Sequence, residues 1–284
     1  MRKTYCMVRI SFLLFCVFIS AVMNAQKIYI NTDLEGISGV YKFDQTRSKD
    51  TPLNIQACEY FMGDLAAVIN GLHEAGIKDI TVLDGHGSQC IIPHLMVPGA
   101  KYITGKPRPG AGNLSELDSS FTGMILLGFH AMMGTPDGIL NHTQSSKTEN
   151  RYWYNGVESG EIAQNAAIAG YYGVPVIMVT GDEALCREAR KFFGNNVVTV
   201  PVKKGLAREA AVLYPFEETR KALFEGARRA VAAIPSCKPY ILKTPIQIRE
   251  TYMGTPGTRE VQEYITRQGV AADALHIFTW SDKK

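Results

Sequence analysis

Hydrophobic positions along the chain fall into two alternating patterns. Short, nearly continuous apolar runs occur at residues 77–83, 123–129, 174–180 and 197–202, and another begins at Lys27 and stops at Asp33. Between them, residues 54–75, 158–170 and 184–193 carry apolar side chains at helical spacing. Continuous apolar runs are typical of strands buried on both faces, and helices between them indicate β-α-β units. The pattern predicts an α/β fold with a mostly parallel central sheet flanked by helices.

Beyond Asn195 the pattern is less regular. It predicts a strand at 197–202, a helix at 216–234, a strand at 240–250, a weak helix at 260–267 and a closing strand at 275–280. We therefore expect a boundary near Asn195, with an α/β metal-binding catalytic domain at 26–195 and a smaller C-terminal α/β subdomain at 196–284.

The first 25 residues have a different character. Basic residues occur at positions 2, 3 and 9, an apolar run covers 10–22, and Met23-Asn24-Ala25 follows. This order is typical of a secretory signal peptide and predicts cleavage after Ala25. Met23 occupies a position where cleavage sites prefer a small residue, so an uncleaved membrane anchor is the alternative. A cleaved signal predicts export to the periplasm or the extracellular space, without stable membrane association afterwards.

Composition and charge mainly argue against certain classes of function. The chain has 284 residues and a formal net charge of +3, and removing 1–25 takes away three basic groups and no acids, which leaves a net charge of zero. A neutral mature protein gives no electrostatic indication of nucleic-acid binding. The remaining cysteines form no C-x-x-C pair, and spacing alone assigns no disulfide; they are Cys58, Cys90, Cys186 and Cys237.

Polar side chains with metal-binding chemistry follow three of the predicted strands. Asp33 and Glu35 follow the first, His86 follows the second, and His130 follows the strand at 123–129. In a parallel sheet the carboxyl ends of the strands share one edge, where ligands bind. Two acids two residues apart in an extended chain point the same way, which indicates a metal site or a proton-sharing dyad; the alternative is that one acid caps the next helix and the other is solvated. Imidazoles with carboxylates and no thiolate favour zinc or a related ion.

Other polar groups receive simpler interpretations at this point. Asp84 and Asp182 stand at strand ends and are interpreted as turn groups or as groups that support the metal ligands, with Asp182 also a candidate cap of the helix that starts at Ala184. Glu161, taken alone, is a surface acid near the positive end of a helix dipole. Lys203 and Arg208 are candidates to hold a peptide carboxylate, with a solvated surface role as the alternative. The chain contains no nucleotide-binding glycine loop and no G-x-S-x-G elbow, which argues against nucleotide chemistry and serine hydrolysis.

Five short motifs occur together in a fixed order. They are Asp33-Leu-Glu35-Gly-Ile-Ser-Gly, Asp84-Gly-His86, Leu127-Gly-Phe-His130-Ala, Thr135-Pro leading to Asn141-His142, and Gly160-Glu161 followed by Ala169-Gly-Tyr-Tyr-Gly-Val-Pro-Val. The ordered set resembles the D-aminopeptidases of the dipeptide-operon, DppA-like family. The resemblance runs from about residue 27 to 182, continues weakly to about 215, and is lost beyond that.

The resemblance implies a peptidase with two zinc ions in each subunit, which removes N-terminal D-residues such as D-alanine from short peptides. It implies that Asp33 bridges the two ions. Glu35 and His130 then complete one site, and His86 and Glu161 complete the other.

The resemblance also makes His142 the catalytic histidine and implies a homo-oligomer, with a decameric ring as the family's form. Two other functions stay open at this point. One is a binuclear metal amidohydrolase acting on L-peptides or other small amides. The other is a secreted peptide-binding protein without turnover.

Overall fold

The computed structural model describes residues 26–87, 89–108, 114–254 and 263–282. The predicted signal peptide at 1–25 lies outside these ranges. Among the residues that the structure describes, no helix combines the length and the apolar character needed to cross a membrane.

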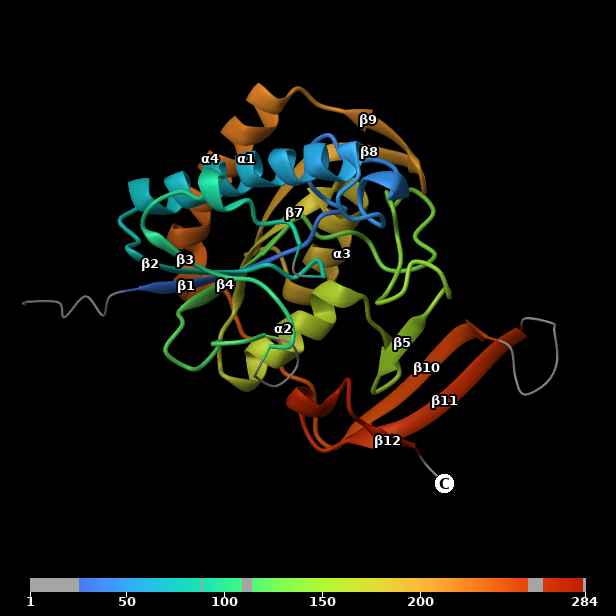
Figure 1. Ribbon diagram of the computed structural model, residues 1–284. Coiled ribbons are helices and arrows are strands. Elements are labelled where there is room, and N and C mark those ends of the chain that lie inside the picture. Colours follow the sequence, from blue (N-terminus) through green and yellow to red (C-terminus); the bar gives the residue numbers. More distant parts are fainter. Residues whose placement is uncertain (1–25, 88, 109–113, 255–262, 283–284) are drawn as a thin grey trace, which may run out of the picture.

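A seven-stranded sheet forms the centre of the molecule (Figure 1), with the strand order β3-β2-β1-β4-β7-β8-β9. All neighbouring pairs are parallel except β8 and β9. The strands are β1 (Lys27–Thr32), β2 (Asp79–Leu83), β3 (Ala100–Ile103), β4 (Gly123–Leu127), β7 (Val176–Asp182), β8 (Val198–Ala207) and β9 (Ala210–Leu213). The predicted mostly parallel central sheet is confirmed.

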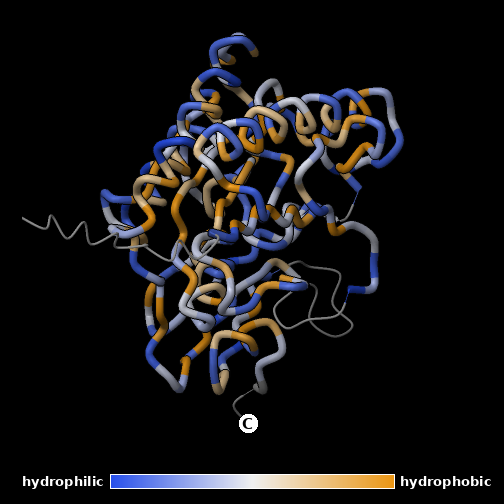
Figure 2. The backbone as a smooth tube through the Cα atoms, turned by 90° about the vertical axis from the view of Figure 1, so that its left-hand side faces the viewer, coloured by the Kyte–Doolittle hydropathy of each residue, from blue (hydrophilic) through white to orange (hydrophobic). Residues whose placement is uncertain are grey.

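Helices cover both faces of this sheet. The helices α1 (Pro52–Glu74) and α4 (Phe216–Ala233) pack together on one face, and α2 (Glu161–Tyr171) and α3 (Glu183–Phe193) lie on the other (Figure 1). Side chains of β1 alternate between two buried clusters, because Ile28 and Ile30 join the α1 and α4 side and Tyr29 joins the α2 and α3 side. Short turns of 3-10 helix occur at η1 (Phe43–Gln45), η2 (Pro93–Leu95), η4 (Ile234–Ser236) and η5 (Ala274–His276). In Figure 2 the outer helices change repeatedly between hydrophobic and hydrophilic colours along their length, as amphipathic helices do.

Local sequence signals explain where the helices begin and end. Thr51 caps α1, since its hydroxyl accepts a hydrogen bond from the Asn54 amide at 3.3 Å. Asp182 caps α3 by accepting from the Leu185 amide at 2.8 Å, which confirms its predicted capping role. Gly194, with φ of 79°, ends α3 in a backbone conformation that favours glycine.

A smaller antiparallel sheet projects from the main body (Figure 1), with the order β12-β11-β10-β5-β6. Its strands are β5 (Arg151–Tyr154), β6 (Val157–Glu158), β10 (Ile246–Gly254), β11 (Glu263–Ala271) and β12 (Ser281–Asp282). The expected boundary near Asn195 stays a prediction. It falls between α3 and β8, and β8 pairs with β7 in the large sheet.

Three expectations for the C-terminal segment are wrong in detail. The strand expected at 240–250 begins only at Ile246. The helix expected at 260–267 is strand β11 from Glu263 onward, because these residues form a long hairpin with β10; 260–262 lie outside the described residues. The strand expected at 275–280 does not form, because these residues belong to the end of the short turn η5 and the segment after it. The last strand is β12.

Lys203 fixes the turn that follows β1. Its side chain is fully buried, and its ammonium donates to the carbonyl oxygens of Glu35 at 2.6 Å, Ile37 at 2.8 Å and Val40. Burial lowers the pKa of Lys203 to about 8, with Asp182 opposing the shift, so the side chain is still protonated at neutral pH. The ammonium therefore supplies three donors to backbone that has no strand partner there.

The first prediction concerns this lysine. Lys203→Met removes the three donors and leaves buried carbonyls unpaired, so the free energy of unfolding should fall by about 3–5 kcal/mol. Lys204→Met is the matched control, because Lys204 is the next residue on β8 and is exposed. Urea unfolding of both variants gives the comparison, and an equal small change in the two would contradict the role of Lys203.

Candidate active site and metal centre

Six side chains from separate segments meet at the carboxyl edge of the parallel strands. Two come from the turn after β1, one follows β2, one follows β4, one begins α2, and one lies in the long loop between β4 and β5. In chain order they are Asp33, Glu35, His86, His130, His142 and Glu161.

The turn after β1 brings both acids into the centre. β1 ends at Thr32, so Asp33 and Glu35 lie in a turn and not on an extended strand, contrary to the expectation from strand alternation. The Asp33 amide donates to the Leu127 carbonyl at 2.8 Å, which ties the turn to β4. At Gly36 a Cβ atom would lie 1.9 Å from the Phe129 carbonyl oxygen, so only glycine fits this close approach. The two acids converge because the turn is held against β4.

His86 contacts both acids with one ring nitrogen. Its Nδ1 lies 2.9 Å from Asp33 Oδ1 and 3.0 Å from Glu35 Oε2. Its Nε2 lies 3.0 Å from the Thr46 carbonyl oxygen. Because a carbonyl only accepts hydrogen bonds, Nε2 carries the proton in that contact, and the tautomer directs the other nitrogen to the acids.

His130 is oriented in the same way. Its Nδ1 donates to the Ala131 carbonyl at 3.0 Å, and its Nε2 faces Asp33 Oδ2 at 3.3 Å and Glu161 Oε1 at 3.5 Å. The side chain is almost completely buried. Asp33 therefore directs one oxygen to His86 and the other to His130.

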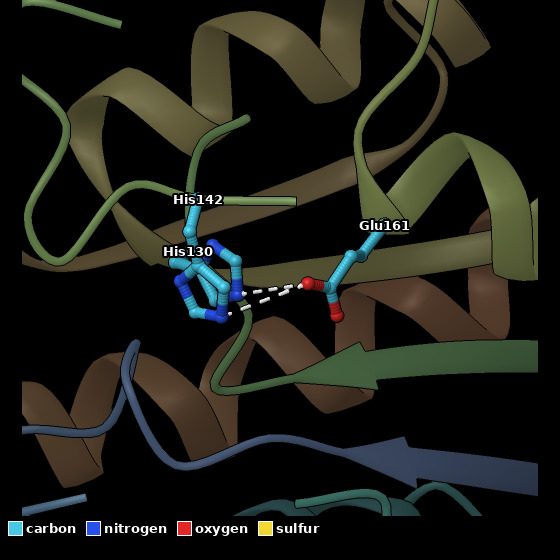
Figure 3. Close-up of side chains that lie close together, drawn as sticks. All are labelled: His130, His142 and Glu161. Atoms are coloured by element: carbon cyan, nitrogen blue, oxygen red, sulfur yellow. Dashed lines mark ion pairs between the residues drawn. The ribbon is translucent and has the colours of Figure 1, made fainter. Parts of the chain in front are cut away.

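His142 lies against His130, with the two rings stacked 3.9 Å apart at 12° (Figure 3). Its Nδ1 donates to the Leu140 carbonyl at 2.8 Å, and its Nε2 is 3.8 Å from Glu161 Oε1. Glu161 is the first residue of α2, and its Oε1 also accepts from the Gln144 amide at 2.7 Å. All three imidazoles thus have one nitrogen fixed by a backbone carbonyl and the other turned toward carboxylates.

The acids respond to this environment in opposite ways. Burial and the neighbouring Glu35 carboxylate raise the pKa of Asp33 to about 7. Burial alone would raise the pKa of Glu35, but attraction by His86 and the other histidines outweighs it and lowers the pKa well below the usual range. Burial likewise opposes ionisation of Glu161, and His130 lowers its pKa to about 2.

The histidines show matching shifts. Burial disfavours the charged form of His130, but Glu161 and Asp33 outweigh it and raise its pKa to about 10. For His86, attraction by Glu35 and Asp33 outweighs burial and raises the pKa well above the usual value. Burial and the stacked His130 lower the pKa of His142 to about 4. Protons on two imidazoles thus balance the acids, and a divalent cation can balance the same charge.

The donor atoms fit a metal ion. Buried Glu35 Oε2 and His130 Nε2 form no well-aligned hydrogen bond among the described residues, although both lie within ion-pair distance of an oppositely charged group. Ligand atoms of Asp33, Glu35 and His130 all lie within 4.8 Å of one another, as do those of His130, His142 and Glu161. Two ligands of one tetrahedral zinc lie about 3.3 Å apart when each bond is about 2.0–2.1 Å, and His130 Nε2 lies 3.3 Å and 3.5 Å from its two acids. Imidazole and carboxylate donors suit zinc.

Groups around these six residues fix their positions. Asp84 Oδ2 accepts from the amides of Cys90 and Ile91 at 2.9 Å and 3.3 Å, which orders the loop that carries His86. Arg208 donates to the Asn141 carbonyl at 3.2 Å and so supports the loop that carries His142. Lys203 is buried in carbonyl contacts, so neither of its expected roles applies. The sequence contains one indication of this burial, which we did not use. Lys203 directly follows the apolar Val202 and continues the same strand.

The comparisons with known proteins agree with one another. A family model described as D-aminopeptidase matches residues 26–269. The chain belongs to the D-aminopeptidase family. A curated D-aminopeptidase of Bacillus subtilis is 33% identical over 189 residues, which cover 65% of this chain and 66% of that protein. The expected family and its peptidase class are confirmed.

A solved structure gives the same result for the fold. It is described as the Zn-dependent D-aminopeptidase DppA from Bacillus subtilis, a self-compartmentalizing protease. It matches with a TM-score of 0.80 and 26% identity, over 88% of this chain and 93% of that chain. The α/β fold expected for this D-aminopeptidase family member is therefore confirmed.

The second prediction concerns metal uptake. Adding zinc to chelator-treated protein should stabilise it, by about 2.7 kcal/mol when free zinc is a hundredfold above Kd. His130→Ala should lose most of this gain, because His130 Nε2 contacts acids from both sides. His94→Ala is the matched control, since His94 lies exposed in η2 away from the acids. Thermal unfolding with and without zinc tests this, and an equal shift in both variants would place the zinc elsewhere.

Proposed function

We propose that this chain is a zinc-dependent aminopeptidase that removes N-terminal D-residues, of the D-alanine type, from short peptides. One observation carries the proposal. Three imidazoles, each fixed by a backbone carbonyl, direct their second nitrogen toward Asp33, Glu35 and Glu161 at the carboxyl edge of the sheet. The DppA structure, similar over most of both chains, is described as Zn-dependent, which supports zinc as the ion.

We propose two zinc ions in each subunit, with Asp33 shared between them. Its two oxygens face two different imidazoles, those of His86 and His130, an arrangement that suits a carboxylate shared by two ions. The resemblance assigns Glu35 with His130 to one ion and His86 with Glu161 to the other, and this allocation stays a prediction. In the structure His86 contacts Glu35, and Glu161 contacts His130.

Zinc bound there supplies a Lewis acid that polarises a carbonyl and lowers the pKa of water toward neutrality. The protein side chains do the rest. Asp33, Glu35 and Glu161 would balance the cation charge at the carboxyl edge of the sheet, and the carbonyl contacts keep the imidazoles from turning away. His142 donates from Nδ1 to Leu140, so its Nε2 is available to accept a proton from the attacking group and return it to the leaving amine.

Export and assembly belong to the same proposal. The basic and apolar pattern of residues 1–25 supports a cleaved signal and a periplasmic or extracellular enzyme, and the intact mass of the mature protein tests it.

The similar structure is described as self-compartmentalizing, which supports a homo-oligomer, and the resemblance implies a decameric ring. Sedimentation of the purified protein measures the number of subunits.

The third prediction is catalytic. The protein should hydrolyse D-alanyl dipeptides, lose activity with a chelator and regain it with zinc. His142→Ala should lower kcat on the order of 100- to 10,000-fold, as loss of a general base does, while zinc still raises the thermal stability. His94→Ala should retain full activity.

Other results would contradict this function in distinct ways. Activity that is indifferent to the chelator would contradict the metal assignment. Faster hydrolysis of L-alanyl than of D-alanyl substrates would favour the amidohydrolase alternative. Peptide binding without product in zinc-loaded protein would favour a binding protein without turnover.

The fourth prediction separates the two acids of the turn. If Asp33 is shared by two ions, Asp33→Ala should lose more zinc per subunit than Glu35→Ala, which removes a ligand of one ion. Metal analysis of both dialysed variants beside the wild-type protein measures this. Equal losses would count against the shared position of Asp33.

A further inference from the structure

A small polar cavity opens beside the metal ligands. Its volume is about 100 Å³, and the residues lining it include Asn31, Asp33, Arg108, Gln144, Glu161 and Phe278. A cavity of this size next to two of the proposed zinc ligands suits the part of a substrate that lies close to the scissile bond.

Arg108 is the basic side chain in this lining. Its Nη1 donates to the Asp84 carbonyl at 2.6 Å, which places the guanidinium at the carboxyl end of β2. The part of the chain that the structure describes places no carboxylate within ion-pair distance of Arg108. A guanidinium has five N–H donors arranged to match a carboxylate.

The cavity also contains an acceptor. Asn31 is buried, its Nδ2 donates to Asn165 Oδ1 at 3.0 Å, and its Oδ1 has no partner among the described residues. A buried carbonyl without a partner costs free energy unless a ligand donates to it. The lining thus offers acid ligands, an acceptor for an N–H group and a cation for an anion.

We propose that Arg108 binds the C-terminal carboxylate of the substrate, one residue beyond the scissile bond, so that the preferred substrates are dipeptides with a free carboxyl end. This inference rests on the proposed function and names the substrate class of the same site. Asn31 Oδ1 accepts from the peptide backbone beside it.

Distances along the sheet support a reach of one residue. β1 and β2 are hydrogen-bonded neighbours, and neighbouring strands lie about 4.7–4.9 Å apart. Asp33 follows β1, and the Asp84 carbonyl that holds Arg108 follows β2. Consecutive Cα atoms are about 3.8 Å apart, so a substrate that extends one residue beyond the scissile bond matches a step of one strand within the cavity that Asp33 and Arg108 both line.

Four other basic groups near the centre have partners within the protein, and one of them, Arg267, pairs with Glu250 at 3.5 Å. Lys203 is used by three carbonyls of the turn after β1. Arg47 and Arg208 both donate to the Ser146 carbonyl and lie over the Phe43 ring. Both arginines support the loop that carries His142. The ring of Phe43, over which they lie, also contacts the ring of His142.

The experiment compares D-alanyl-D-alanine with D-alanyl-D-alaninamide, which has the same scissile bond without the terminal charge. Wild-type enzyme should prefer the free acid roughly 10- to 100-fold in kcat/KM, the range for hydrogen bonds to a charged group. Arg108→Gln should remove this preference mainly by raising KM for the acid, and Arg108→Lys should restore part of it. Lys106→Gln is the matched control, because it removes one positive charge from the same loop at an exposed position.

The ratio between the two substrates is measured within each variant, so a general folding defect cancels. Wild-type enzyme that hydrolyses both substrates equally well would overturn the role of Arg108 and leave the proposed function standing. The same holds if Arg108→Gln lowers both activities to the same extent. Zinc-loaded wild-type protein that hydrolyses neither substrate, nor D-alanine p-nitroanilide, would overturn the proposed function and this inference with it.

Discussion

The structure depends on one electrostatic constraint, which is that three buried carboxylates share a small space. Asp33 and Glu35 repel each other there, and burial disfavours the charged form of all three acids. Protons or a cation must therefore balance the charge of these acids. Protons on His86 and His130 do so when no cation is bound, and zinc does so in the proposed enzyme.

The fold meets this constraint by placing four of the six groups just after strand ends and the other two on the start of α2 and on a loop beside them, each held by backbone contacts. The carboxyl edge of a parallel sheet brings the ends of β1, β2 and β4 together, so residues far apart in sequence become neighbours. Carbonyl oxygens of Thr46, Ala131 and Leu140 then set the three imidazole tautomers. Lys203 orders the turn that carries two of the acids.

This arrangement explains which site residues could be predicted from the sequence. The β-α-β core and four of the site residues follow from periodicity, because they lie at or directly after the ends of strongly apolar strands. Glu161 begins a helix and His142 lies in a long loop, where periodicity carries no signal, so only the family resemblance identified them. The helix expected near residue 260 is wrong, because β11 is stabilised by pairing with β10, which a local pattern does not reveal. The pairing of β5 with β10 joins segments about 100 residues apart and is equally hidden.

The central claim is that Asp33 holds two zinc ions at the carboxyl edge of the sheet. The most direct test is anomalous diffraction, recorded above and below the zinc absorption edge, from a crystal of zinc-loaded protein. We expect two peaks per subunit, both beside the Asp33 carboxylate. A single peak, or peaks that do not touch Asp33, would contradict this account of the site.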